Sequence, residues 1–147
     1  MIDDLALKIV RALNQNARKS YREVAKEVGT SATAVINKVR RLEESGAIKG
    51  YIPIVDPGHF GIELVAIIAL RISKGKLLET QQRISSDRRV AAVYDITGEW
   101  DSLVIGYFKG RDDLNDFIKG VLSLPFIDRT VTHLVLNIVK DEKRIFL

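Results

Sequence analysis

The sequence predicts an α+β protein in which a helix-turn-helix domain of the winged type precedes a ferredoxin-like βαββαβ domain that dimerises through its sheet. Hydrophobic residues recur at helical spacing over the first third of the chain and at strand spacing after residue 62. Glycines stand where the second and third helices should end, and the strands are apolar on both faces. The expected boundaries are residues 1–50 for the helix-turn-helix domain, 51–60 for an extended linker strand and 61–147 for the second domain.

The first two helices are expected to lead into a tight turn. The first lies in the segment DDLALKIVRALNQNA, where Ile9 and Leu13 recur at helical spacing after an acidic start. The second begins after Ser20, which can form a capping box with Glu23, and it ends at Gly29. A third helix follows at once, so the three have the helix-turn-helix arrangement.

The third helix carries the candidate DNA-binding surface. Val35, Val39 and Leu42 form its apolar stripe when residues are placed at about 100° steps, and Gly46 can close the helix. The opposite side carries hydroxyl, amide and guanidinium groups, which read base edges and phosphates in a major groove. The candidate DNA-binding residues are Tyr21, Ser31 (also the expected N-cap), Thr33, Asn37, Lys38, Arg40 and Arg41. The alternative is an ordinary polar helix face in contact with water.

The composition favours a globular protein that binds a polyanion. Hydrophobic residues make up 46% of the chain, charged residues make up 29%, and the formal net charge is +4. Residues 1–58 hold ten Lys or Arg against seven Asp or Glu, a net of +3, so most of the basic excess lies there. A basic surface that is merely solvated is the alternative.

Several classes of protein are excluded or disfavoured. The absence of cysteine excludes thiolate catalysis, disulfides and cysteine metal sites. The apolar runs are too short to span a bilayer, and no signal pattern is present. A cytoplasmic protein without a membrane partner is therefore expected.

The second part of the chain alternates strand and helix patterns in the order βαββαβ. The expected strands are IELVAIIALRIS, VAAVYDIT, SLVIGYF and RTVTHLVLNIV. The expected helices are KLLETQQRISS and RDDLNDFIKGVLSLP, the second capped by Asp112 or Asp113. The residues expected to face inward from these helices are Leu77, Leu78, Gln81, Ile84, Leu114, Phe117, Ile118, Val121 and Leu122.

Both faces of this sheet are expected to be covered. In the first strand, Ile68 and the residues alternating with it are apolar, and so are Ile67 and its alternate neighbours. Two helices cover one face in such a fold, and a second copy of the sheet is the simplest cover for the other. A homodimer is therefore expected, and Ile67→Asp or Val104→Asp should disrupt it if those residues lie on the face without helices.

The chain as a whole resembles the Lrp/AsnC transcriptional regulators, also called feast/famine regulatory proteins. IDDLALKIVRAL is similar to the family's opening, and NARKSYREVAKEVGTSATAVINKVRRLEESGAIKGY is similar to its helix-turn-helix and exit. Gly98 and Asp101, in the stretch TGEWD, match the family's Gly-x-x-Asp turn. Two positions depart from the pattern, because Ala6 stands where Asp is usual and Thr30 where Leu is usual.

The resemblance implies a sequence-specific transcriptional regulator whose assembly or DNA affinity responds to a free amino acid. It implies a homodimer that assembles further to an octamer, with the amino acid bound at the turn between dimers. The implied effector-binding residues are Thr97, Gly98, Glu99, Trp100, Asp101, Thr132 and His133, the last two from a neighbouring subunit. Backbone N–H groups of the turn would bind the α-carboxylate, and Asp101 would accept from the α-ammonium. Glutamine is the expected effector, and no cofactor or metal is expected.

Three alternatives remain open. An architectural DNA-binding protein without an effector would use the same basic head. A tetrapyrrole-modifying enzyme of the same two-domain plan would use histidines near the sheet, such as His133. No catalytic motif is present, so an enzyme is not expected. At the turn, Trp100 could pack in a contact between dimers without any ligand.

Overall fold

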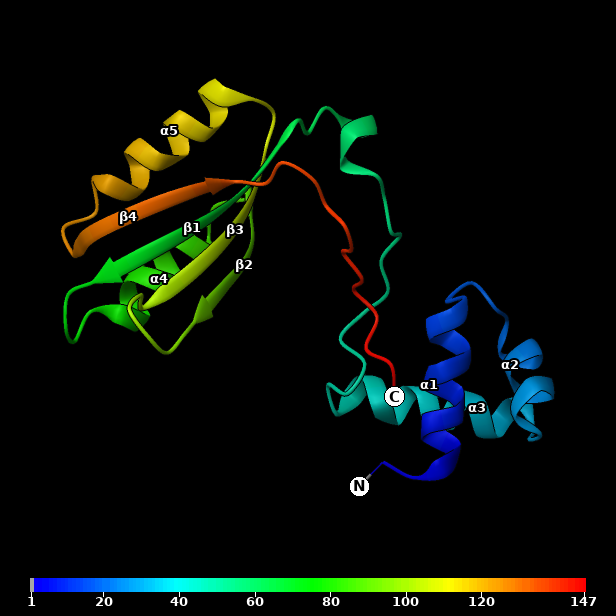
Figure 1. Cartoon of the computed structure of the whole chain (residues 1–147). Coiled ribbons are helices and arrows are strands. Elements are labelled where there is room, and N and C mark those ends of the chain that lie inside the picture. Colours follow the sequence, from blue (N-terminus) through cyan, green and yellow to red (C-terminus); the bar gives the residue numbers. More distant parts are fainter. Residues whose placement is uncertain (1) are drawn as a thin grey trace. The chain divides into compact units, whose positions relative to one another are not determined.

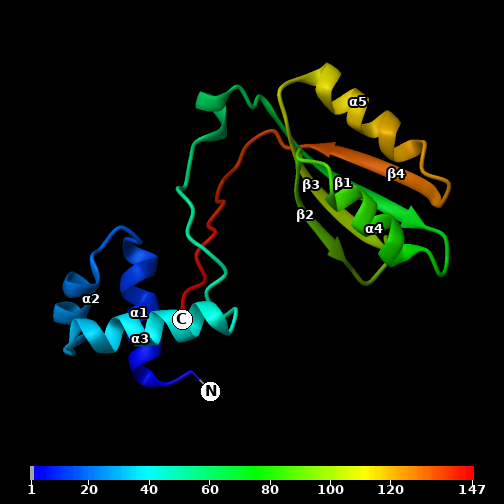
Figure 2. The same cartoon turned by 180° about the vertical axis from the view of Figure 1, so that it is seen from behind.

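The computed structural model describes residues 2–147, and the chain divides into two compact units. We call the unit of residues up to Ile54 together with Lys140–Leu147 the helical head, and the unit Val55–Val139 the sheet domain. Within residues 2–147, the head contains three α-helices, and the other unit contains a four-stranded sheet, two α-helices and a 3-10 helix. Figures 1 and 2 show how these elements are arranged within each unit. The predicted α+β class is confirmed.

The helical head packs three short helices around a small core. These helices are α1 (Asp4–Gln15), α2 (Tyr21–Val28) and α3 (Ala32–Glu44). Ser20 and Glu23 form the expected capping box, and Gly29 ends α2 in the left-handed conformation with φ 74°. These local interactions satisfy backbone groups that have no partner inside a helix. The core residues are Ile9, Ala12, Leu13, Val24, Ala25, Val35 and Val39.

The expected linker strand over residues 51–60 is not formed, and no wing follows α3 within residues 2–147. Residues 51–56 have neither helical nor strand structure, and Pro57–Phe60 is a 3-10 helix. Pro53 and Pro57 have no N–H to donate to a neighbouring strand, which disfavours sheet pairing over this stretch.

The end of the chain also differs from the expected boundary of 61–147, because Lys140–Leu147 belongs to the helical head. Arg11 Nε donates to the carbonyl oxygen of Leu147 at 2.7 Å. Asn14 Nδ2 donates to the carbonyl oxygen of Ile145 at 3.0 Å. The tail is therefore held to α1 by side chains that bind its backbone, a contact that hydrophobic periodicity cannot reveal.

The sheet domain has the predicted βαββαβ order. Its elements are β1 (Leu64–Ile72), α4 (Leu77–Ser85), β2 (Val90–Asp95), β3 (Ser102–Phe108), α5 (Arg111–Leu122) and β4 (Ile127–Leu134). The strands lie in the order β2-β3-β1-β4, and every neighbouring pair is antiparallel. Strand β4 ends at Leu134, earlier than the pattern RTVTHLVLNIV predicted.

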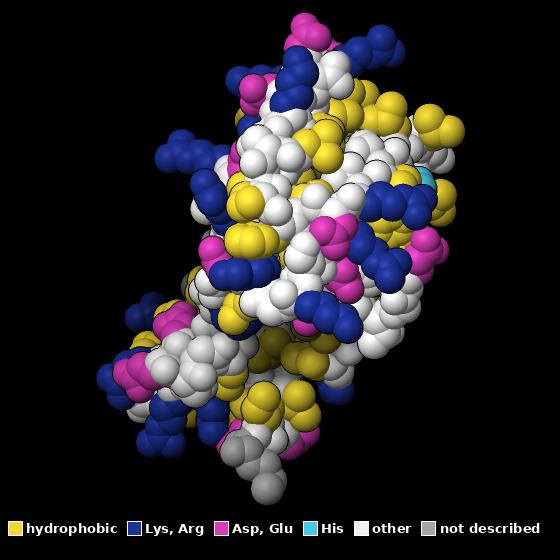
Figure 3. Space-filling view, turned by 90° about the vertical axis from the view of Figure 1, so that its left-hand side faces the viewer, with side chains coloured by type: hydrophobic (Ala, Val, Ile, Leu, Met, Phe, Trp, Pro, Cys, Tyr) yellow, Lys and Arg dark blue, Asp and Glu magenta, His cyan; other side chains and the backbone are white. Residues whose placement is uncertain are grey.

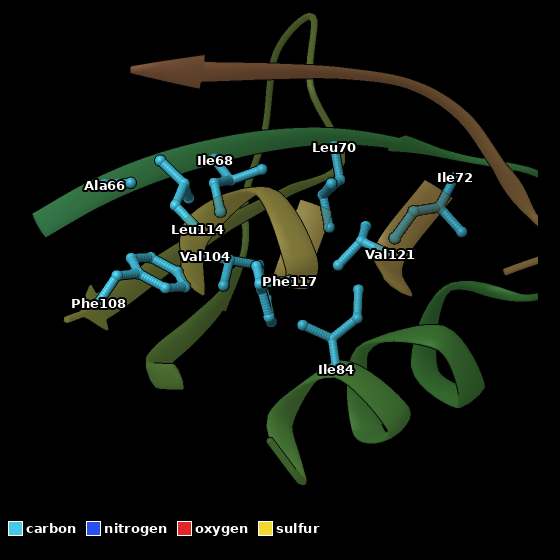
Figure 4. Close-up of a cluster of buried hydrophobic side chains, with 10 residues drawn as sticks. All are labelled: Ala66, Ile68, Leu70, Ile72, Ile84, Val104, Phe108, Leu114, Phe117 and Val121. Carbon is cyan, nitrogen blue, oxygen red and sulfur yellow. The ribbon is translucent and has the colours of Figure 1, made fainter. Parts of the chain in front are cut away.

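The two helices of the sheet domain pack on one face of the sheet. Figure 4 shows Ile68 and Leu70 of β1 and Val104 of β3 directed toward Ile84 of α4 and Phe117 of α5. Each of these side chains is at most 3% exposed, so this face is the hydrophobic core of the domain.

Three expectations about the helices of the sheet domain were wrong. Leu78 is 67% exposed and Thr80 is buried in its place, because α4 is rotated relative to the expected orientation. Leu122, in the last turn of α5, is also exposed. The N-cap of α5 is Gly110, so neither Asp112 nor Asp113 caps it. Asp113 instead accepts from the Lys109 N–H at 2.9 Å, one turn away.

The other face of the sheet carries no helix of the sheet domain, and we call it the open face. Ile67 lies opposite Ile105, and Val65 lies opposite Tyr107, so their side chains share this face. All four side chains are partly exposed. The expectation for Ile67 is therefore met, whereas Val104 was misplaced, because it is 1% exposed in the core beneath the helices.

Candidate DNA interface and candidate effector site

The outward face of α3 gathers the side chains predicted to read DNA. Thr33, Asn37, Arg40 and Arg41 are all exposed, on the side away from the buried stripe that includes Val35. Arg40 Nη2 donates to Asn37 Oδ1 at 3.3 Å, and Arg40 Nε lies 3.9 Å from Glu44 Oε1. The Asn37 amide and the Arg40 guanidinium, which are the two groups most suited to base edges, thus lie side by side on one helix surface.

Two of the predicted DNA-binding residues have structural partners within the head. Ser31 Oγ accepts from the Ala34 N–H at 3.1 Å as the N-cap of α3. Lys38 Nζ lies 2.6 Å from Asp3 Oδ2, and this hydrogen bond is the main reason that the pKa of Asp3 lies below its ordinary value. Lys38 therefore ties α3 to the start of α1.

Tyr21 lies at the start of α2 and lines an open groove of about 480 Å³ together with Tyr51 and Lys19. Tyr51 Oη donates to Glu43 Oε1 at 2.9 Å. Partial burial, followed by this bond to Glu43, raises the pKa of Tyr51 to about 12. The Tyr51 hydroxyl is thus protonated at neutral pH and holds the chain beyond α3 against that helix.

One residue of the α3 surface was not predicted from the sequence to face outward. Ile36 is 45% exposed, and it is the one large hydrophobic side chain exposed within Ala32–Glu44. It precedes Arg40 by four residues, so the two are neighbours along the helix surface. Its position outside the buried stripe of Val35 and Val39 could have predicted from the sequence that Ile36 is exposed.

The acidic bend, residues 97–101, is fixed to the end of β1 by its last residue. Asp101 Oδ2 accepts from the Ile72 N–H at 2.8 Å, and the Asp101 N–H donates to the Leu70 carbonyl oxygen at 3.0 Å. Gly98 has φ 111°, a conformation that side chains with a Cβ rarely adopt. Asp101 therefore has a structural role in addition to any contact with a ligand.

Arg129 of β4 is the residue at the acidic bend that the sequence reading missed. Its Nη1 lies 3.7 Å from Glu99 Oε1, and its guanidinium carbon lies 5.0 Å from the centre of the Trp100 ring. This distance is typical of a cation–π contact. The bend thus meets β4 of its own chain through Arg129, at the first residue of the segment RTVTHLVLNIV.

Thr132 and His133 do not close the acidic bend within one chain. Thr132 pairs with Ile68 and lies on the helix side of the sheet, whereas His133 pairs with Ile67 on the open face. His133 is four residues from Arg129, about 13 Å along the strand. Their part in a site with the bend therefore requires a neighbouring subunit, as predicted, and stays a prediction.

A buried hydrogen-bond chain supports the residue that follows the bend. Ser102 is 0% exposed, and its Oγ donates to the Tyr94 carbonyl oxygen at 3.0 Å. Gln81 Nε2 donates to Ser102 Oγ at 2.6 Å. Gln81 thus links α4 to the start of β3, which explains why this polar residue faces inward.

The described residues contain neither a metal-binding cluster nor a membrane-spanning helix. Within residues 2–147, no group of three or more His, Asp or Glu side chains is arranged to hold a metal ion. None of the helices in that range is long and apolar enough to cross a membrane.

Comparison with protein families matches both units of the chain. Residues 2–43 match the AsnC-type helix-turn-helix domain, and residues 65–145 match the Lrp/AsnC ligand binding domain. A relative from Pyrococcus abyssi, named as an HTH-type transcriptional regulator, is 41% identical over 99% of both chains. The HTH-type transcriptional regulator Ptr1 of Methanocaldococcus jannaschii is 37% identical over 96% of both. Together, these matches define a DNA-binding transcriptional regulator that has a ligand-binding domain.

Solved structures have the same fold. AsnC of E. coli has a TM-score of 0.88 at 25% identity and covers 98% of this chain, which covers 98% of AsnC. A transcriptional regulator from Neisseria meningitidis, solved in complex with L-Met, has a TM-score of 0.88 at 22% identity, with 99% and 96% covered. The chain belongs to the Lrp/AsnC family. The relatives named above are transcriptional regulators, and none of their names supports the tetrapyrrole-enzyme alternative.

Proposed function

We propose that the protein binds specific operator sequences in duplex DNA through the outward face of α3, and that a free amino acid bound at the acidic bend modulates its assembly or DNA affinity. The observation that carries the proposal is the grouping of Thr33, Asn37, Arg40 and Arg41 on one exposed helix surface. Amide and guanidinium groups make the bidentate contacts that distinguish adenine and guanine in the major groove.

The first test separates a sequence-specific regulator from an architectural protein. Duplexes from a random library are selected over several rounds with the full chain, and the enriched sequence is then footprinted. We expect one motif, with protection limited to it. Protection that spreads over the whole duplex, without an enriched motif, would favour the architectural alternative.

A second part of the proposal is a homodimer through the open face. Val65, Ile67 and Ile105 place a row of partly exposed apolar side chains there, on the face that carries no helix of the sheet domain. Exposed hydrophobic side chains are not confined to the open face, since the side of the molecule drawn in Figure 3 also has hydrophobic side chains at its surface among charged ones. Two heads brought together by such a dimer would read two half-sites one helical turn apart, or a multiple of it. Further assembly to an octamer would bring the bend near a neighbouring subunit.

The acidic bend is the proposed binding site of the free amino acid. A zwitterion needs an anion site and a cation site close together, and the backbone N–H groups near Gly98 together with Asp101 provide them. The structural neighbour solved with L-Met supports amino-acid chemistry for this kind of domain. Glutamine is our first candidate, because Glu99 and, from a neighbouring subunit, Thr132 and His133 offer both donors and acceptors.

Calorimetry with the twenty amino acids tests the effector part. Asp101→Asn is the informative variant, since its amide oxygen can still accept from the Ile72 N–H while the negative charge is lost. Asp95→Asn, which removes an exposed carboxylate at the end of β2, is the matched control. We expect Asp101→Asn to weaken binding at least tenfold and the control to bind normally. Equal binding by both variants would remove Asp101 from the site.

A further inference from the structure

Ile36 is an unusual side chain for the middle of an exposed helix face. It is 45% exposed, although the neighbouring Val35 is fully buried. A β-branched residue is also a weaker helix former than alanine or lysine. Ile36 therefore contributes little to the fold of the head, and its apolar surface faces outward.

The neighbours of Ile36 are the groups already assigned to DNA. Thr33 precedes it by three residues and Arg40 follows it by four, so both adjoin it on the helix surface. Arg40 donates a hydrogen bond to Asn37, which follows Ile36 directly in the sequence. Ile36 also lies in the second turn of α3, and the N-terminal part of such a helix is the part that meets base edges.

The major groove offers one apolar group for such a side chain. Of the base edges that line it, only thymine carries a methyl group, at C5. We propose that Ile36 reads the 5-methyl group of a thymine and thereby sets the base preference at one position of each half-site. This inference rests on the proposed DNA binding by α3 and adds an apolar contact to its polar ones.

Replacing thymine by uracil tests the contact directly, because uracil lacks only the methyl group and keeps the hydrogen-bonding edge. Duplexes enriched with the full chain are amplified with either thymidine or deoxyuridine triphosphate. Gel shifts then compare wild type, Ile36→Ala and Ile52→Ala. Ile52 is also an exposed isoleucine of the helical head but lies outside α3, so it is the matched control. Ile36→Ala should fold, since alanine favours a helix.

Burial of one methyl group is worth about a fourfold change in affinity, and two half-sites would give about fifteenfold. We expect wild type and Ile52→Ala to lose this factor on uracil DNA. Ile36→Ala should bind thymine DNA more weakly and lose nothing further on uracil DNA, as a double-mutant cycle requires. Single uracil substitutions should then locate the thymine.

Two outcomes would overturn the inference. Wild type could bind both duplexes equally, or Ile36→Ala could show the same loss on uracil DNA as wild type. Failure of the library to yield any enriched sequence is a different result, because it would overturn the proposed DNA reading and this contact with it.

Discussion

The outward face of α3 and the acidic bend differ in how much of each one chain supplies. The α3 face takes all its groups from thirteen consecutive residues, Ala32–Glu44, so a single helix brings them together. The bend combines residues 97–101 with Ile72 of β1 and Arg129 of β4, while His133 lies about 13 Å from Arg129. In our proposal, therefore, DNA reading is local to one head, whereas the effector site depends on assembly.

The largest expected effect comes from Ile67→Asp on the open face. Burying one Ile side chain contributes about 1.5–3 kcal/mol, and a buried unpaired carboxylate costs more, so the dimer should dissociate. Light scattering at micromolar concentration measures the mass. Leu78→Asp, at an exposed site of α4, is the control and should remain dimeric. A monomeric wild type would contradict the role given to the open face.

Asp101→Ala should destabilise the sheet domain by about 1–3 kcal/mol, because the Ile72 N–H would lose its acceptor beside a buried side chain. Asp101→Asn should cost clearly less, since its amide oxygen can replace the carboxylate there. Denaturant unfolding followed by Trp100 fluorescence measures both variants. Equal losses would show that the carboxylate charge, and not the hydrogen bond, holds the bend.

Arg129→Gln should have a smaller effect, about 0.5–1 kcal/mol, because its contact with the Trp100 ring is exposed to solvent. Trp100 is the single tryptophan, so its emission reports on this contact. We expect a shifted emission spectrum in Arg129→Gln and an unchanged one in Arg83→Gln, at an exposed site of α4. An unaltered spectrum in both variants would mean that Arg129 does not stack on the ring in solution.

The smallest effect concerns Asp3 and Lys38. The pKa of Asp3 is lowered in the folded head, chiefly by its bond to Lys38. The stability that this pair adds is therefore present above the ordinary Asp pKa and is lost as pH falls through the lower folded value. Thermal melts should show that Asp3→Asn lowers stability at neutral pH and has no effect below that window. Asp3 Oδ1 also accepts from the Ala6 N–H at 2.8 Å as the N-cap of α1, so an equal effect at both pH values would point to this cap and not to the charge.

The features that depend on residues close together in the sequence were predicted correctly. The capping box of Ser20 and Glu23 and the buried stripe of α3 follow from short-range spacing. The orientation of α4 was harder to predict, because hydrophobic spacing favours burial of Leu78, whereas the structure exposes Leu78 and buries the polar Thr80. Arg129 at the bend could not be predicted, because its contact depends on strand order and not on spacing along the chain.

The most direct test of the account is a gel shift with the enriched duplex and scrambled competitor DNA. It compares wild type, Arg40→Ala, Arg41→Ala and Arg83→Ala, the last being an exposed arginine of the sheet domain. A base-contacting arginine is worth about 1–3 kcal/mol of discrimination, so Arg40→Ala or Arg41→Ala should lose roughly five- to 150-fold in specificity. Arg83→Ala should bind as wild type does. Unchanged specificity in both α3 variants would contradict DNA reading by this helix.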